Sequence, residues 1–166
     1  MSELDDILSQ SRQTGRFVER RRFSLAKDKA VEKLRRYSLP DPNDYVLELV
    51  RAGTFAQARA MAFEADDDRL TIAWLGGTPL QSSDLIQLFD FLLLRRRGGQ
   101  HRQVVHVAMA VNAALQAGHS QVRIVSGDGT RAQTVRVDIS ASGEAVMGEP
   151  EEGLNGTFIS VDKKDK

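Results

Sequence analysis

Apolar residues recur along this chain with a helical period in some stretches and with strict alternation in others. The stretches with helical spacing are predicted to be helices: 24–37, 45–53, 82–93 and 101–117. Asp41 and Pro42 precede the second of them, a pair typical of a helix start, because the Asp oxygen accepts from free backbone N–H groups. Gly118 follows the last predicted helix and marks its end.

Alternation of apolar and polar residues predicts strands in a second set of stretches: 59–64, 70–74, 121–126, 133–139 and 156–162. Between the first two stand three adjacent carboxylates, Asp66, Asp67 and Asp68. We interpret this triplet as the solvated turn of a hairpin rather than as a metal site. The Gly- and Glu-rich stretch 140–155 is predicted to be a loop.

Helices, a hairpin, two further helices and three closing strands therefore follow one another along the chain. Such an order predicts the α+β class, a two-layer sandwich with helices packed on one face of a mixed, mostly antiparallel sheet. We expect a polar N-terminal arm at 1–15, one domain at 16–162 and a charged tail at 163–166. Short Pro and Gly clusters give no sign of a second domain.

Composition narrows the function classes only slightly. The chain has 166 residues, 23 basic against 23 acidic ones and no cysteine, which excludes disulfides and thiolate metal sites and favours a cytoplasmic setting. The longest apolar run, 85–94, is broken by Gln87 and Asp90 and is too short to cross a membrane. The three histidines lack metal-ligand spacing, so we expect no metal site.

Two clusters of arginines raise the question of nucleic acid. Four arginines lie within 16–25 and three more at 95–97. Because no aromatic residues interleave with them as a stacking platform, we interpret 16–25 as an edge strand and 95–97 as a basic loop. Nucleic acid is the less favoured partner, and a protein partner or a second copy of the chain is the alternative.

Glu48 is the first candidate for chemistry, since it is the one carboxylate among Val46, Leu47, Leu49 and Val50. An ionised group in such surroundings is costly unless it faces a wet cleft or a cation. The other interpretation places Glu48 on the exposed edge of an amphipathic helix. Both remain open at this point.

Three short segments, in this order, carry a family resemblance: Glu48-Leu49-Val50-Arg51-Ala52, the strand 70–75 running into Gly76-Gly77, and Leu154-Asn155-Gly156-Thr157-Phe158. With the elements between them, they resemble the ATP-binding domain of the GHKL superfamily, the Bergerat fold of DNA gyrase, sensor histidine kinases, a heat-shock chaperone and a mismatch-repair ATPase. The resemblance covers roughly residues 23–162.

The resemblance implies a role for each matching residue. Glu48 would activate the attacking water, the backbone at Gly76 and Gly77 would approach the adenine, and Thr157 would support the base through its hydroxyl group. ATP or ADP is then the implied cofactor. Mg²⁺ is less well supported, because Ala52 stands where the family has its metal-binding Asn.

A second departure concerns the base. Trp74 or Leu75 stands where the family has the Asp that accepts a hydrogen bond from the adenine amine. Two hypotheses follow. The chain is a divergent GHKL-type nucleotide-binding domain with at most weak ATP hydrolysis, or it is a degenerate domain of that fold that binds no nucleotide and acts as a protein-interaction or regulatory module.

Overall fold

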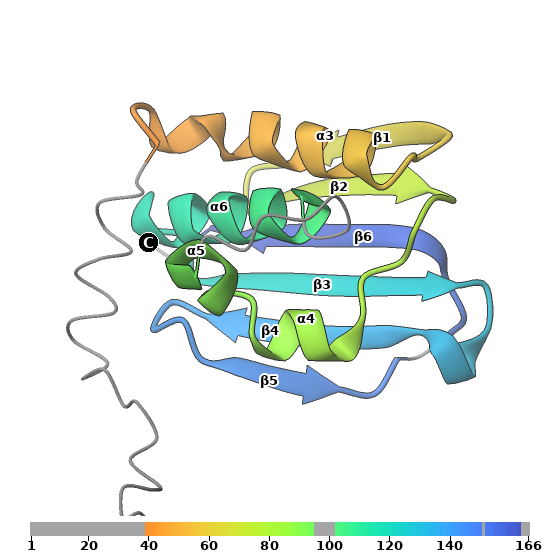
Figure 1. The fold of residues 1–166 in the computed structure, drawn as a ribbon. Coiled ribbons are helices and arrows are strands. Elements are labelled where there is room, and N and C mark those ends of the chain that lie inside the picture. The colour runs from red at the N-terminus through yellow and green to blue at the C-terminus, as the bar shows by residue number, and fades with distance from the viewer. Residues whose placement is uncertain (1–38, 95–101, 151, 164–166) are drawn as a thin grey trace, which may run out of the picture. The chain divides into compact units, whose positions relative to one another are not determined.

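The computed structural model describes residues 39–94, 102–150 and 152–163, in which helices lie on one side of a six-stranded sheet (Figure 1). Its helical elements are η2 (Pro42–Asp44), α3 (Tyr45–Phe55), α4 (Ser82–Ile86), α5 (Asp90–Leu94), α6 (Arg102–Gln116) and η4 (Arg131–Gln133). Its strands are β1 (Ala60–Ala65), β2 (Arg69–Leu75), β3 (Gln121–Asp128), β4 (Val135–Ser140), β5 (Ala145–Gly148) and β6 (Asn155–Asp162).

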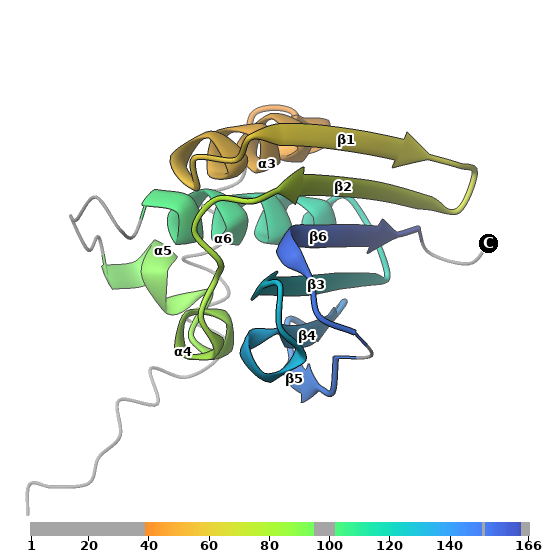
Figure 2. The same ribbon diagram turned by 90° about the vertical axis from the view of Figure 1, so that its right-hand side faces the viewer.

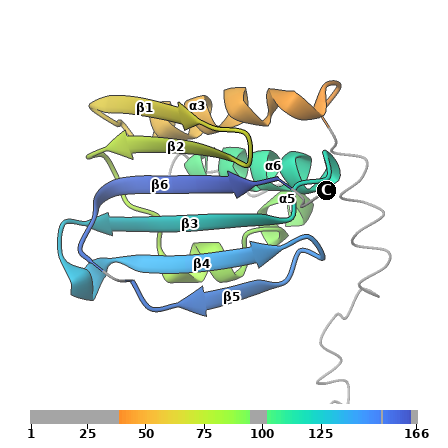
Figure 3. The ribbon, with the colours of Figure 1, turned by 180° about the vertical axis from the view of Figure 1, so that it is seen from behind.

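The strands lie side by side in the order β1-β2-β6-β3-β4-β5, which Figure 3 shows from the side without helices. All five neighbouring pairs are antiparallel. The last strand of the chain, β6, is inserted between β2 and β3, so the helical segment after β2 crosses over one face of the sheet. The predicted α+β, two-layer architecture is confirmed, and the described pairs are antiparallel rather than mixed.

Alternation along the strands sorts residues between the two faces of the sheet. Ile72, Ile159 and Ile124 pair across β2, β6 and β3, and all three are fully buried on the face that the helices cover. In Figure 2 the helices lie on one side of the strands and leave the opposite side open. We call these two sides the helix-covered face and the open face.

The two longest helices, α3 and α6, contact each other, α6 also contacts β3, and Gly53 of α3 lies against Trp74 of β2. Small residues allow this close approach. Four alanines of α6 are buried against the core: Ala108, Ala110, Ala113 and Ala114. Ala52 of α3 is buried in the same core cluster.

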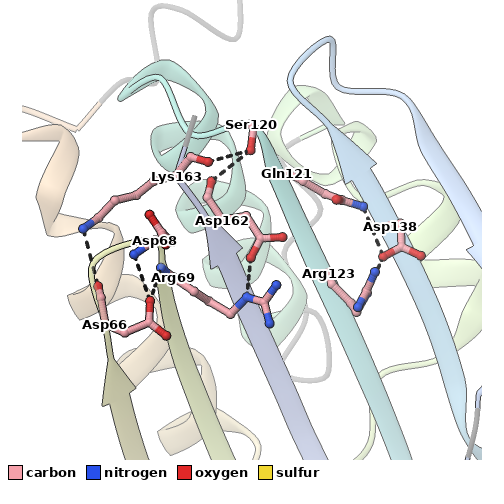
Figure 4. A network of polar contacts seen from close by, with 9 residues as sticks. All are labelled: Asp66, Asp68, Arg69, Ser120, Gln121, Arg123, Asp138, Asp162 and Lys163. Carbon is pink, nitrogen blue, oxygen red and sulfur yellow. Dashed lines mark hydrogen bonds and ion pairs between the residues drawn. The ribbon is translucent and has the colours of Figure 1, made fainter. Parts of the chain in front are cut away.

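The predicted hairpin is confirmed, and the acidic triplet forms its exposed turn. Asp66 Oδ1 accepts from the backbone N–H groups of Asp68 and Arg69 at 2.9 and 2.7 Å. These two bonds, which Figure 4 shows, hold the pKa of the Asp66 carboxyl below its usual value. The triplet therefore serves the turn.

Two predicted elements need correction. The helix expected over 82–93 is two short helices, α4 and α5, because the chain tightens where Asp90 N–H donates to the Gln87 carbonyl at 2.9 Å. The loop expected at 140–155 contains strand β5, which pairs with β4. β5 lies at the edge of the sheet, and three of its four residues are exposed, so its sequence carries little alternation.

Several predictions lie outside the described residues: the arm 1–15, the strand 16–25, the helix 24–37, the basic loop 95–97 and most of the tail 163–166. The domain bounds 16–162 therefore stay a prediction. Within the described ranges, no helix has the length and apolar character needed to cross a membrane.

Candidate functional site

Glu48 lies on the side of α3 that faces α6, and only 2% of its surface is exposed. Its Oε2 atom lies 2.6 Å from Nδ1 of His106 on α6, and its Oε1 atom accepts from Arg51 Nη1 one turn along α3. The exposed-edge interpretation of Glu48 is therefore wrong. The carboxylate is buried beside cationic and imidazole partners, which offset the cost of burying a charge.

Aromatic and cationic groups extend this arrangement toward the protein surface. The His106 ring stacks on Phe55, with the ring centroids 5.1 Å apart and the planes 7° from parallel. The guanidinium of Arg102 lies 5.5 Å from the centroid of the Phe55 ring. We call these residues, Glu48, Arg51, Phe55, Arg102 and His106, the Glu48 cluster.

The Glu48 cluster has a definite hydrogen-bonding chemistry. An ionised carboxylate only accepts hydrogen bonds, so the His106 ring donates to Glu48 through Nδ1. The other ring nitrogen, Nε2, takes no part in this bond. Both carboxylate oxygens of Glu48 already hold a side-chain donor. The cluster thus orients the His106 ring and ties α3 to α6.

Trp74 occupies the space between β2 and α3. Its indole is fully buried, and two of its ring carbons lie 3.3 Å from where a Cβ atom would stand on Gly53 of α3. Trp74 is also the register partner of Thr157 on β6. The large ring of Trp74 on β2 therefore packs where Gly53 of α3 has no side chain.

Gly76 and Gly77 form the turn that leaves β2, both with positive φ, +67° and +81°. A Cβ on Gly77 would lie 2.4 Å from the carbonyl oxygen of Ala56, which accepts from Thr78 N–H at 2.7 Å. The turn packs directly on the C-terminal end of α3. Backbone conformation and this close contact account for both glycines.

Thr157 is buried, and its hydroxyl lies 2.7 Å from Ser126 Oγ of β3. Ser126 Oγ also accepts from the backbone N–H of Leu80 at 2.9 Å and lies 3.3 Å from the Gly156 carbonyl. If Ser126 donates to that carbonyl, Thr157 donates to Ser126. The Thr157 hydroxyl thus closes a buried network that holds the segment after β2 against the sheet.

The structure brings together three of the four residues that the resemblance marked. Leu75 pairs with Gly156, and Gly76 N–H donates to the Asn155 carbonyl at 3.1 Å, so Gly76, Gly77 and Thr157 gather where β2 ends beside β6. Glu48 lies on the same helix-covered face, on α3, but its contacts reach toward α6. Trp74 pairs with Thr157 on β6 beside this group.

Sequence reasoning missed three residues of this region. Gln103 of α6 is buried and donates to the Thr78 carbonyl at 3.2 Å, next to the Gly76-Gly77 turn. Ser126 had a signal, since it continues the inward alternation of Val122 and Ile124 with a polar group. His106 had none, because its pairing with Glu48 depends on how two distant helices cross.

A second aromatic contact lies at the other end of the α3–α6 pair. The rings of Tyr45 and His119 meet edge to face, with their centroids 5.4 Å apart. Burial raises the pKa of the Tyr45 hydroxyl and lowers the pKa of the His119 imidazole. Both groups are therefore kept neutral near pH 7.

Comparisons with known proteins leave the family open. No family model matches the chain, and no curated protein matches it. Among solved structures, the N-terminal domain of a DNA repair protein matches with a TM-score of 0.47 and 12% sequence identity over 76% of this chain. The chain spans 38% of the length of that protein chain.

Proposed function

We propose that this chain is a divergent GHKL-type domain that does not bind ATP in the manner of that superfamily and acts as a protein-interaction or regulatory module. One observation carries the proposal: Trp74, one of the two residues that stand where the superfamily has its base-reading Asp, is fully buried against Gly53. In the superfamily this position faces the adenine. The burial of the indole supports a site closed to a base.

The chemistry of the indole also opposes adenine recognition. The adenine amine is a donor and needs an acceptor, whereas the indole of Trp74 offers only an N–H donor. That N–H group, Nε1, is buried and has no hydrogen-bond partner among the described residues. Loss of the base-reading hydrogen bond alone weakens binding by about 1–3 kcal/mol, before the cost of moving a packed Trp.

Phosphate chemistry also lacks support along α3. Ala52 is fully buried and carries no oxygen for Mg²⁺, and the oxygens of Glu48 are held by Arg51 and His106. Phosphoryl transfer depends on positioning and charge neutralisation by the metal. Efficient ATP hydrolysis is therefore not part of the proposal, and neither is a resident Mg²⁺ ion.

The described edge strand β1 favours a protein partner. Five of its six residues are exposed, and Phe63 is 53% exposed. An edge strand has unpaired backbone N–H and carbonyl groups along one side, and another strand can add there. We propose a protein partner or a second copy of this chain at β1, in a cytoplasmic setting.

Nucleotide binding is the second candidate function, and one observation favours it. Gly76, Gly77 and Thr157 gather at the end of β2, and Glu48 lies on the same face of the sheet. Under this alternative, ATP or ADP would bind weakly after a rearrangement of Trp74. Hydrolysis through Glu48 would then be slow.

A thermal melt with and without millimolar ATP, ADP and Mg²⁺ separates the two functions. We expect no shift with any nucleotide. A site occupied at about 100 times its dissociation constant would stabilise the fold by about 2.7 kcal/mol, which such a melt resolves easily. A magnesium-dependent shift that is absent in Glu48→Gln would instead establish the nucleotide function and overturn the proposal.

A further inference from the structure

A cavity of about 390 Å³ lies on the open face of the sheet, away from the residues that the resemblance marked. Its floor comes from three neighbouring strands. Val125 of β3 pairs with Phe158 of β6 on one side and with Arg136 of β4 on the other. Arg123, two residues before Val125 on the same strand, extends this floor.

Residues from the connection between β5 and β6 complete the lining of the cavity: Pro150, Glu152, Gly153 and Leu154. Backbone hydrogen bonds hold this segment in place. Leu154 N–H donates to Thr134 Oγ1 at 3.1 Å, and Gly129 N–H donates to the Leu154 carbonyl at 2.9 Å. These bonds fix the wall of the cavity, and a fixed wall is typical of small-molecule sites.

Charge is distributed unevenly around the cavity. Asp138 accepts from Arg123 Nε at 2.6 Å through Oδ1, and from Arg136 Nε and Nη2 at 3.0 and 2.9 Å through Oδ2. Gln121 Nε2 lies 3.4 Å from the same Oδ1 atom, and Figure 4 shows Gln121, Arg123 and Asp138 together. Two guanidinium groups share one carboxylate, so one positive charge stays unbalanced within this group.

The two arginines keep part of their side chains exposed to solvent. The side chains of Arg123 and Arg136 are 36% and 22% exposed, and both residues line the cavity. Arginine presents several N–H donors in a planar fork that matches a carboxylate. The exposed Glu152 is the opposing charge in the lining, and it weakens the attraction for an anion without filling the floor.

Apolar side chains form the rest of the lining: Val125, Pro150, Leu154 and Phe158. We propose that this cavity binds a carboxylate attached to an apolar body, with the carboxylate at Arg123 and Arg136 and the apolar body on Phe158 and Leu154. The cavity volume lies in the range of about 300–1,000 Å³ that small-molecule sites occupy. The same chemistry is offered by a free organic acid and by the C-terminal residue of a peptide.

The test is a titration of the full chain followed by proton–nitrogen correlation NMR, with phenylbutyrate as the probe. Phenylbutanol has the same apolar body without the charge, and acetate has the charge without the body. We expect phenylbutyrate to shift the amide signals of Val125, Leu154 and Phe158 and to bind about tenfold more tightly than either control. Equal binding of phenylbutyrate and phenylbutanol would overturn the proposal.

Variants assign the binding to the arginines. Arg136→Gln is expected to weaken phenylbutyrate about tenfold, and Glu152→Gln is expected to strengthen it by about two- to fivefold. Arg69→Gln is the matched control, because Arg69 lies on the same face and holds Asp162 at 2.5 Å outside the cavity lining. If Arg69→Gln and Arg136→Gln weaken binding equally, the proposal fails.

Two further arms keep the result interpretable. If Arg136→Gln does not fold, Glu152→Gln still tests the proposal, because Glu152 is exposed. An unchanged affinity of Glu152→Gln for phenylbutyrate contradicts the proposed charge attraction. A short peptide ending in phenylalanine, with a free or an amidated C-terminus, distinguishes a peptide end from a free acid as the source. The outcome is independent of the nucleotide melt, because the cavity lies on the opposite face of the sheet.

Discussion

The two faces of the sheet have opposite character. On the helix-covered face, the space between β2 and α3 is filled by Trp74, and the polar groups of Thr157 and Ser126 are bonded to each other. On the open face, Arg123 and Arg136 line a cavity and remain partly exposed to solvent. Of the residues that the resemblance marked, Glu48 and Thr157 lie on the filled face, and Gly76 and Gly77 form the turn that leaves β2.

This difference shows that a resemblance in sequence does not by itself establish a ligand site. Gly76, Gly77 and Thr157 are required here by a turn, a close backbone contact and a buried hydroxyl network. Each has a structural reason that does not depend on a ligand. The open-face cavity has no such account, since its charged groups are neither buried nor fully paired.

The largest effect is expected from Trp74→Ala, which would empty the filled face. Removing a fully buried Trp costs about 3–5 kcal/mol, because apolar burial is lost and a cavity remains. Urea denaturation of the variant measures this loss. Leu75→Ala is the control, since Leu75 is 52% exposed on the open face and its loss should cost within about 0.5 kcal/mol.

Ligand addition sharpens the same experiment. Indole should stabilise Trp74→Ala and leave the natural chain unchanged, because an apolar cavity of this kind binds an apolar ligand of matching size. If Trp74→Ala lowers the free energy of unfolding by less than about 1 kcal/mol, the Trp74 side chain does not fill the space between β2 and α3. The proposal that no nucleotide binds there is then contradicted.

Gly156→Ala tests the close contact between β6 and β2. Its φ of +134° and a Cβ position 2.1 Å from the Trp74 carbonyl oxygen predict a loss of about 1–3 kcal/mol or more. Gly118→Ala is the control variant, because Gly118 also has a positive φ, +94°, but has open space around its Cβ position. The difference between the two midpoints in urea isolates the contact from the backbone strain.

Much of the fold was predictable, because local patterns determine it. The hairpin β1–β2, helix α6 and strands β3 and β6 follow from alternation and helical spacing that each segment carries within itself. β5 was missed because an exposed edge strand buries little and so needs little alternation. The break between α4 and α5 was missed because no Gly or Pro marks it.

The candidate site was less predictable, because it depends on register and helix crossing. The neighbours of Glu48 left its burial open, and its partner His106 lies 58 residues away in sequence. The pairing of Arg123 with Asp138 likewise arises only from the register of β3 and β4. Single residues therefore indicate that a group needs a partner, and the fold decides which one.

A smaller effect is expected from Glu48→Gln on the helix-covered face. The amide keeps the size of the side chain but loses the charge that His106 and Arg51 share, so we expect a loss of about 1–3 kcal/mol. Glu64→Gln on the exposed strand β1 should stay within about 0.5 kcal/mol. If Glu48→Gln leaves the free energy of unfolding unchanged, the Glu48 cluster is not needed for stability. Glu48 is then again a candidate functional residue.

The smallest effect is expected from pH at His119, at the end of the helix-covered face. Burial lowers the pKa of His119 in the folded state, the Asp162 backbone carbonyl partly offsets this, and nearby Lys163 adds to it. Between the unfolded pKa of 6.5 and the lower folded value, the unfolded chain binds more protons. Stability is therefore full above pH 6.5 and decreases as the pH falls through this window.

His119→Phe keeps a ring against Tyr45 and should reduce the loss of stability between about pH 7.5 and 5.5 by less than about 1 kcal/mol, since the imidazole is partly exposed. Urea midpoints of both chains at the two pH values give the comparison, and equal pH dependence would mean that the His119 imidazole is already solvated in the folded state.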